Sequence, residues 1–133
     1  MPGSSVALLL LLACGSPVGG ELRPELIPAK ETIAAGETAR VVLRNLSEVE
    51  VRYGACDLRL ERETAARWEL IGPARWGSVG SEGYACIGIA YVLLAGASAE
   101  FEWETSGLVP GAYRFRMEIS PKTIYSPPFR IVP

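Results

Sequence analysis

The segment between residues 108 and 119 constrains the fold of this chain more than any other. It begins with the turn Pro110-Gly111, where Pro presets φ and Gly accepts a positive φ without steric cost. Apolar and polar side chains then alternate without a break, and one face carries Tyr113, Phe115, Met117 and Ile119. A period of two with one apolar face is typical of a strand that covers a core on one side.

Short alternating runs separated by turn signals occupy most of the remaining chain. Val41 and Leu43 alternate with polar neighbours, and so do Phe101 and Trp103. No apolar pattern with a period of 3.6 residues is longer than the N-terminal segment. About seven to eight short strands of this kind predict an all-β fold, an immunoglobulin-like antiparallel β-sandwich rather than a barrel.

Three details refine the prediction of the strands. Gly54 interrupts an alternating run, which indicates a bulge or a close approach of the backbone. Trp68 and Leu70 follow a polar hairpin tip and are expected to face the core. The pair Pro127-Pro128 restricts the last strand to a sheet edge, or splits it with a bulge.

The N-terminal segment is predicted to lie outside the domain. Its apolar run Val6–Ala13 is too short to cross about 30 Å of hydrocarbon, which needs roughly 20 residues, so residues 1–13 are interpreted as a signal peptide. The sequence Leu11-Leu12-Ala13-Cys14 resembles the lipobox of bacterial lipoproteins, in which the Cys is lipidated. The resemblance implies a lipidated Cys14, a flexible tether over residues 14–22 and a domain over residues 23–133. An ordinary secretory signal with an incidental Cys is the alternative.

The three cysteines agree with an exported protein. If Cys14 carries lipid, Cys56 and Cys86 remain as an even pair. In an oxidising compartment such a pair most simply forms one disulfide. Two buried thiols are the alternative. Because the chain has no His, a zinc site built on these cysteines would lack its usual companions.

The composition also argues against catalysis. Without His there is no Ser-His or Cys-His nucleophile, and Asp57 is the only Asp, so paired aspartates are excluded. The row Glu100, Glu102 and Glu104 could hold a hard cation, but a solvated face that protects a sheet edge is the favoured interpretation. We expect no catalytic residue, metal or cofactor. A formal net charge of −2 with scattered Lys and Arg makes nucleic acid an unexpected partner.

The best candidate for a binding surface is a loop over Gly72–Gly83 with Trp76 and Tyr84, together with Tyr91. Loops on a rigid scaffold carry recognition, and aromatic side chains dominate binding hot spots. The apolar run Ala85–Leu94 predicts either a strand covered on both faces or a partly exposed patch.

Several short motifs occur in a recognisable order between Thr38 and Val132. They are Tyr53-Gly54, Leu58-x-Leu60-Glu61-Arg62, Trp68, the turn Ala95-Gly96-Ala97-Ser98 and Leu108-x-Pro110-Gly111-x-Tyr113-Arg114-Phe115. Their order resembles a family of bacterial immunoglobulin-like domains found on secreted and lipid-anchored proteins. It is also similar to the intracellular proteinase-inhibitor family. The Tyr after the Pro-Gly turn fits a tyrosine corner, in which the phenol bonds to upstream backbone.

The resemblance implies an accessory or binding role with no shared catalytic residue. We therefore expect a non-enzymatic lipoprotein facing the periplasm or the cell exterior, anchored in the membrane by lipid and bound to a protein of the cell envelope. The alternative is a proteinase inhibitor that presents the loop Gly72–Gly83 to an enzyme cleft.

Overall fold

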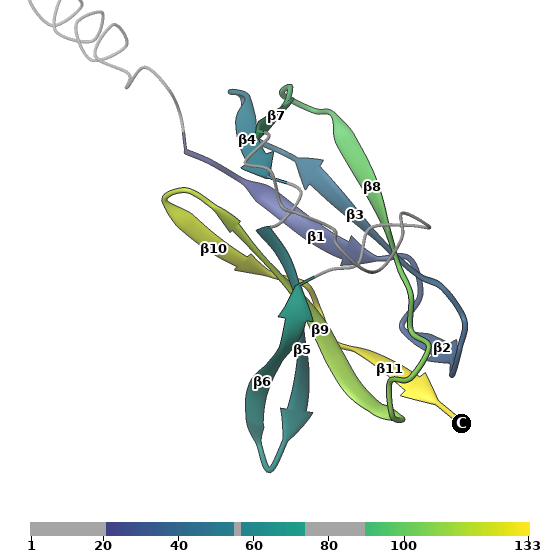
Figure 1. Ribbon diagram of the computed structural model, residues 1–133. Helices are drawn as coiled ribbons and strands as arrows, with labels where there is room; N and C mark the ends of the chain where they lie inside the picture. Colours follow the sequence, from purple (N-terminus) through teal and green to yellow (C-terminus); the bar gives the residue numbers. More distant parts are fainter. Residues whose placement is uncertain (1–20, 55–56, 74–89) are drawn as a thin grey trace, which may run out of the picture.

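The computed structural model describes residues 21–54, 57–73 and 90–133 of the chain. These residues form eleven β-strands (Figure 1). The strands are β1 (Pro24–Pro28), β2 (Thr32–Ala34), β3 (Ala39–Asn45), β4 (Val51–Gly54), β5 (Leu58–Thr64), β6 (Arg67–Pro73), β7 (Ala90–Leu93), β8 (Ser98–Trp103), β9 (Gly111–Ile119), β10 (Lys122–Tyr125) and β11 (Phe129–Val132). Within the described ranges, no helix is of the length and apolarity that crossing a bilayer requires.

The strands form two larger sheets and one separate pair. One sheet has the order β1-β3-β8, and the other has the order β2-β11-β9-β5-β6, with β10 also paired to β9. Strands β4 and β7 pair with each other. All these pairs are antiparallel except β2 with β11, which is parallel. The prediction of an all-β chain is confirmed, although the described residues contain more strands than the seven or eight expected.

Some of the additional strands arise where the chain switches from one pairing strand to another. After Pro28 the chain leaves β3, and β2 then pairs with β11 in the other sheet. Near the C-terminus, β10 and β11 both pair with β9, with Ser126 and the two prolines between them. Ser126 N–H donates to the Phe115 carbonyl at 2.8 Å, and Phe115 N–H donates to Ser126 Oγ at 2.8 Å. The predicted split of the last strand is therefore confirmed.

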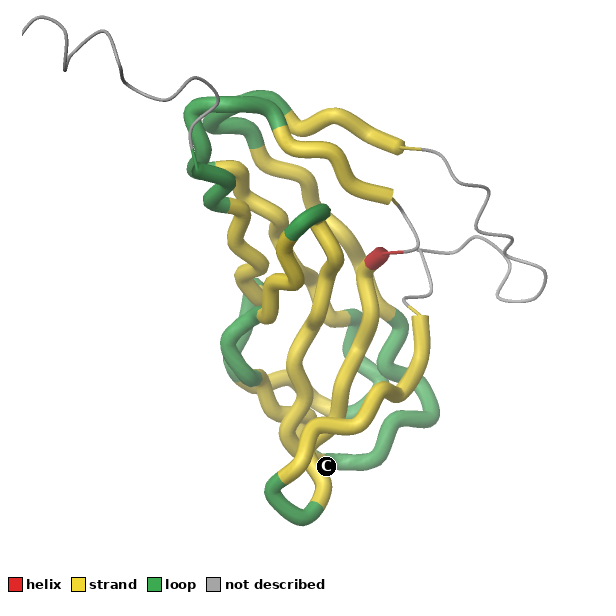
Figure 2. Tube along the Cα trace, turned by 90° about the vertical axis from the view of Figure 1, so that its left-hand side faces the viewer, coloured by secondary structure: helices red, strands yellow, loops and turns green. Residues whose placement is uncertain are grey.

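The core lies between the two larger sheets, whose strands run along the length of the molecule (Figure 2). The face of β9 predicted to be apolar is buried, with Tyr113, Phe115, Met117 and Ile119 each at most 1% exposed. From the other sheet, Trp103 meets Phe115 edge to face with 5.7 Å between ring centroids. Phe101 and Trp103 of β8 are also buried, as their alternation predicts.

Two expectations about the hairpin of β5 and β6 were wrong. Trp68 and Leu70 do not enter the core: Trp68 is half-buried outside it, and Leu70 is 51% exposed. They pair with Glu63 and Glu61, and the Glu61 side chain lies on the solvent side of the sheet with Arg114. A register shift between Leu60 and Glu61 accompanies this arrangement. Alternation shows which residues share a face, but the register decides which face is buried.

The finer expectations at the two ends of the domain are met in part. Gly54 is a close approach: its N–H donates to Asp57 Oδ2 at 2.8 Å, and an added Cβ would lie 2.9 Å from that oxygen. Leu22, which the sequence assigns to the tether, is partly buried against the core. Its carbonyl accepts a hydrogen bond from Lys122 Nζ at 2.7 Å.

Candidate functional site: the outer face of the six-stranded sheet

The solvent side of β6, β5, β9 and β10 gathers aromatic and charged side chains from four strands. The alternation that buries Tyr113 and Phe115 turns Arg114 and Arg116 to the opposite side of β9. Register places Glu61 opposite Arg114, and Tyr125 opposite Arg116. We call this surface the outer face and define it by Glu61, Trp68, Arg114, Arg116 and Tyr125.

Arg114 lies at the centre of the outer face between two aromatic rings. Its guanidinium carbon is 4.4 Å from the ring centroid of Trp68 and 4.1 Å from that of Tyr125. Both distances are within the range of a cation–π contact, which is worth about 0.5–1 kcal/mol at exposed sites and more where water is excluded. The two rings therefore hold the guanidinium in one place from β6 and from β10.

Beneath Arg114 lies a carboxylate that is almost fully covered. The Glu61 side chain is 8% exposed although it is on the solvent side of the sheet. Arg114 Nε donates to Glu61 Oε1 at 2.7 Å, and Arg116 Nη1 lies 3.8 Å from Glu61 Oε2. Arg116 Nη2 also donates to Glu118 Oε1 at 3.2 Å. A buried charge needs such pairing to offset its desolvation, so Glu61 fixes both arginines.

The outer face combines the residue types that dominate binding hot spots with a fixed geometry. Trp, Tyr and Arg are enriched at such positions because they bury large areas and still offer polar atoms. Tyr125 is 47% exposed, and Trp68 is half-buried. Because the rings and the guanidinium already hold one another, binding would cost little further side-chain entropy.

This site was missed by sequence reasoning. The signal was present in Glu61, Arg114 and Arg116, which are all polar positions of strands with one apolar face. Their meeting depends on the pairing of β5 with β9, which alternation within either strand does not encode.

Of the binding residues predicted from the sequence, Tyr91 is described and lies elsewhere. It belongs to β7, is 45% exposed, and stacks on Tyr53 with 5.5 Å between ring centroids. Burial, with a smaller contribution from Tyr91, raises the pKa of Tyr53 above 10. Trp76 and Tyr84 lie outside the described residues, as do Cys14, Cys56 and Cys86.

The two predicted loop and strand segments are described only in part. Gly72 and Pro73 belong to β6, and the rest of the predicted loop to Gly83 lies outside the described residues. Of the two interpretations of Ala85–Leu94, its described part supports a partly exposed patch: Ala90, Tyr91 and Val92 are exposed, and Leu93 is buried. Leu94 is 64% exposed.

Tyr113 makes the backbone bond expected of a tyrosine corner. Its side chain is fully buried, and its hydroxyl donates to the Val109 carbonyl at 2.6 Å. The ring lies 6.1 Å from that of Phe129, measured between centroids. Tyr113 therefore links the turn before β9 to the core and does not belong to the outer face.

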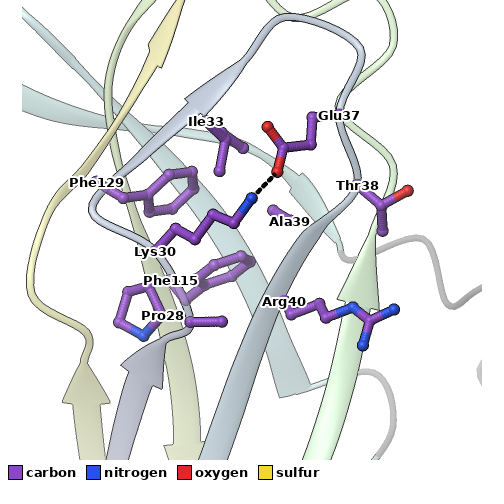
Figure 3. Close-up of a pocket in the computed structure, with 10 residues that line it drawn as sticks. Pro28, Lys30, Ile33, Glu37, Thr38, Ala39, Arg40, Phe115 and Phe129 are labelled. Carbon is purple, nitrogen blue, oxygen red and sulfur yellow. Dashed lines mark hydrogen bonds and ion pairs between the residues drawn. The ribbon is translucent and has the colours of Figure 1, made fainter.

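A cavity of about 460 Å³ lies where β1 gives way to β2 (Figure 3). Phe115, Phe129 and Ile33 line its apolar side, and Lys30 Nζ bonds to Glu37 Oε2 at 2.6 Å across the rim. This bond, with the N–H of Ala34, holds the pKa of Glu37 below its ordinary value. Because Lys30 and Glu37 at the rim bond to each other, the cavity has space for a ligand but few free polar groups to bind it.

Glu100 and Glu102 of β8, and Glu104 just after it, are exposed, as their alternation predicts. Arg40 on the neighbouring strand lies 3.4 Å from Glu100 and 3.3 Å from Glu102, measured between side-chain N and O atoms. Over residues 21–54, 57–73 and 90–133, no cluster of three or more candidate metal ligands occurs.

No protein-family model and no curated protein matches the chain. Among solved structures, it is similar to the alkylpurine DNA glycosylase AlkC of Pseudomonas fluorescens bound to DNA containing an abasic site analog. The identity is 14% and the TM-score is 0.50, over 86% of this chain and 31% of that chain. A β-glucosidase from Listeria innocua in complex with gluconolactone matches with 14% identity and a TM-score of 0.48, over 84% of this chain and 16% of that chain. The sporulation control protein Spo0M of Bacillus subtilis matches with 14% identity and a TM-score of 0.46, over 86% of this chain and 49% of that chain.

The chain thus spans about a third of the glycosylase chain and less of the glucosidase. At 14% identity, the first of these similarities concerns the all-β fold alone. It carries no information about activity.

Proposed function

We propose that this chain is a non-enzymatic, lipid-anchored protein of the cell envelope whose immunoglobulin-like domain binds a protein partner through the outer face. The observation that carries the proposal is the position of Arg114, held between Trp68 and Tyr125 above the covered carboxylate of Glu61. Arg, Trp and Tyr are the residue types that dominate binding hot spots.

The strand order supports the immunoglobulin-like class. The order β1-β3-β8 corresponds to strands A, B and E of such a sandwich, and β5-β9-β11 corresponds to strands C, F and G. The bond from Tyr113 to the Val109 carbonyl is the one a tyrosine corner makes near the start of strand F. One departure is that β4 and β7 pair with each other instead of extending the first sheet.

The first residues of the chain support the proposed export and lipid anchoring. The apolar run Val6–Ala13 followed by Cys14 fits a signal segment and a lipidation site. Export would place Cys56 and Cys86 in an oxidising compartment, where we propose that they form a disulfide.

The intact mass of the protein extracted from membranes tests the proposed export, lipidation and disulfide. We expect a chain that begins at Cys14 and carries acyl groups, and that gains two hydrogens on reduction of one disulfide. A chain that retains Met1 and carries no lipid would contradict the proposal.

Cross-linking on cells tests the outer face as the binding surface. We expect Arg114→Ala and Tyr125→Ala to abolish or strongly reduce the capture of one specific envelope protein. Arg40→Ala is the matched control, because Arg40 is also an ion-paired arginine on a sheet surface but belongs to the other sheet. Equal capture by all three variants would refute the outer face as the interface.

A further inference from the structure

One end of the molecule displays several large apolar side chains to solvent. Four of the eight exposed large hydrophobic residues in the described ranges come from β7 and from the turns beside β4 and β7 (Figure 1). We call this region the apolar end, and its members are Leu46, 44% exposed, Tyr91, 45%, Val92, 49%, and Leu94, 64%.

A buried amide holds the two leucines of the apolar end in their exposed positions. Asn45 is fully buried, and the two hydrogens of its Nδ2 are shared among the carbonyls of Val49, Leu93 and Leu94, with N···O distances of 2.9, 3.0 and 3.1 Å. Its Oδ1 accepts the N–H of Ser47 at 2.9 Å. Leu46 and Leu94 therefore stand on backbone that is already ordered, so a contact made by them would cost little backbone entropy.

The chain enters the domain at the same end. Arg23 N–H donates to Ser47 Oγ at 2.5 Å, and its carbonyl accepts the N–H of Leu46 at 3.0 Å. Only seven residue steps separate Cys14 from Glu21, and seven fully extended steps span at most about 25 Å. An anchor at Cys14 would therefore keep Glu21, two residues before Arg23, within about 25 Å of the bilayer.

We propose that the apolar end docks on the lipid bilayer, with Leu46 and Leu94 inserted into the boundary between headgroups and acyl chains. The proposal rests on the proposed function in that the lipid anchor brings this end to the membrane. An exposed apolar patch marks an interaction surface, and stable attachment to a bilayer needs more than one weak apolar signal.

The charges near the apolar end indicate that docking is hydrophobic rather than electrostatic. Arg52, opposite Val92 in the strand pair, lies 3.7 Å from the Glu50 carboxylate. Glu21, Arg23 and Glu48, close to the chain entry or to Leu46 in the sequence, are exposed as well. Because both signs of charge occur together, docking should depend little on ionic strength.

Fluorescence quenching in vesicles tests the proposal. The full-length protein would be expressed in a bacterial host, extracted from its membranes, and reconstituted in vesicles of phosphatidylethanolamine and phosphatidylglycerol, with and without dibrominated acyl chains. Three variants, Leu46→Trp, Leu94→Trp and Val109→Trp, are compared with the parent chain, whose own three Trp give the background. Val109 is the matched control because it is 51% exposed and precedes β9, at the opposite end of the molecule (Figure 1).

We expect the emission added by Leu46→Trp and Leu94→Trp to fall in brominated vesicles, and to fall equally at low and high salt. The emission added by Val109→Trp should not change. Equal emission with and without bromine at positions 46 and 94, or equal quenching at position 109, would overturn the proposal. A blue shift at 46 and 94 that grows with protein concentration and needs no vesicles would assign the apolar end to a second copy, and would also overturn it.

The mass measurement separates this proposal from the proposed function. An acylated Cys14 without quenching at 46 and 94 keeps the anchor and refutes docking. Quenching at 46 and 94 in a chain without acyl groups supports docking and refutes the anchor.

Discussion

The two ends of this molecule use the same device for different purposes. At each end, one fully buried polar side chain bonds to backbone: Asn45 at the apolar end and Tyr113 at the end where β9 begins. The Tyr113 ring is part of the core and stacks on Phe129. Its one hydrogen bond, to the Val109 carbonyl, fixes the turn before β9 to that core. Asn45 instead makes four bonds and holds Leu46 and Leu94 in solvent. A buried polar side chain can thus either close one end of a sandwich or hold apolar side chains exposed at the other.

Replacement of Asn45 should give the largest effect. Asn45→Ala removes a donor from three carbonyls and the acceptor of the Ser47 N–H, although the Leu94 carbonyl keeps the N–H of Ala97. An unsatisfied buried group costs about 1–3 kcal/mol. We expect the free energy of unfolding in urea to fall by about 3 kcal/mol or more. Asn45→Asp keeps the acceptor for Ser47 but loses every donor, so it should be nearly as destabilising. A loss below about 1 kcal/mol would show that the turns are ordered without the side chain of Asn45.

Replacement of Glu61 tests whether its ion pairs on the sheet surface contribute as much to the free energy of unfolding as the neutral amide of Asn45. Glu61→Ala removes the carboxylate from two arginines, of which Arg114 has a side chain only 23% exposed. We expect a loss of about 2 kcal/mol in urea unfolding, less than for a fully buried pair because the arginines reach solvent. The control is Glu102→Ala, whose exposed ion pair with Arg40 should contribute at most about 0.5–1 kcal/mol. Equal losses in the two variants would show that the covering of Glu61 has no energetic consequence.

Tyr113→Phe isolates the single bond at the other end. The ring and its packing on Phe129 remain, and only the bond to the Val109 carbonyl is lost. We expect a loss of about 1–1.5 kcal/mol in the free energy of unfolding. A loss as large as that of Asn45→Ala would mean that the two ends depend equally on their buried polar groups.

The smallest effect is expected at the rim of the cavity, where Lys30 is exposed and Glu37 is half-buried. The Lys30 bond and the Ala34 N–H hold the pKa of Glu37 below 4.5 in the folded chain. A lowered folded pKa contributes stability that is present above pH 4.5 and is lost as the pH falls through the folded pKa. Lys30→Met should therefore be slightly less stable than the parent at pH 7, and the difference should vanish below the folded pKa of Glu37. A difference that is constant with pH, measured by urea unfolding, would exclude this linkage.

The sequence determines the buried faces of single strands well. Tyr113, Phe115 and Met117 in β9, and Phe101 and Trp103 in β8, could be assigned to the core because alternation has a period of two. The break at Pro127-Pro128 could be predicted because Pro cannot donate to a ladder. These features are local, and local chemistry fixes them.

Features that need two strands at once could not be predicted. Trp68 and Leu70 were assigned to the wrong face because their side depends on pairing with Glu63 and Glu61. The position of Arg114 between Trp68 and Tyr125 requires the register of four strands. The role of Asn45 could not be predicted either, because the carbonyls of Leu93 and Leu94 that it bonds to come from a segment distant in the sequence.

The parallel pairing of β2 with β11 has a mechanical consequence when the two ends of the domain are pulled apart. Thr32, Ile33 and Ala34 lie beside Arg130, Ile131 and Val132. Because these strands are parallel and close to opposite termini, a force that pulls the termini apart loads their hydrogen bonds in shear, all together. An unzipping geometry would load them one at a time. The short β2–β11 pair therefore serves as a clamp against extension of the chain.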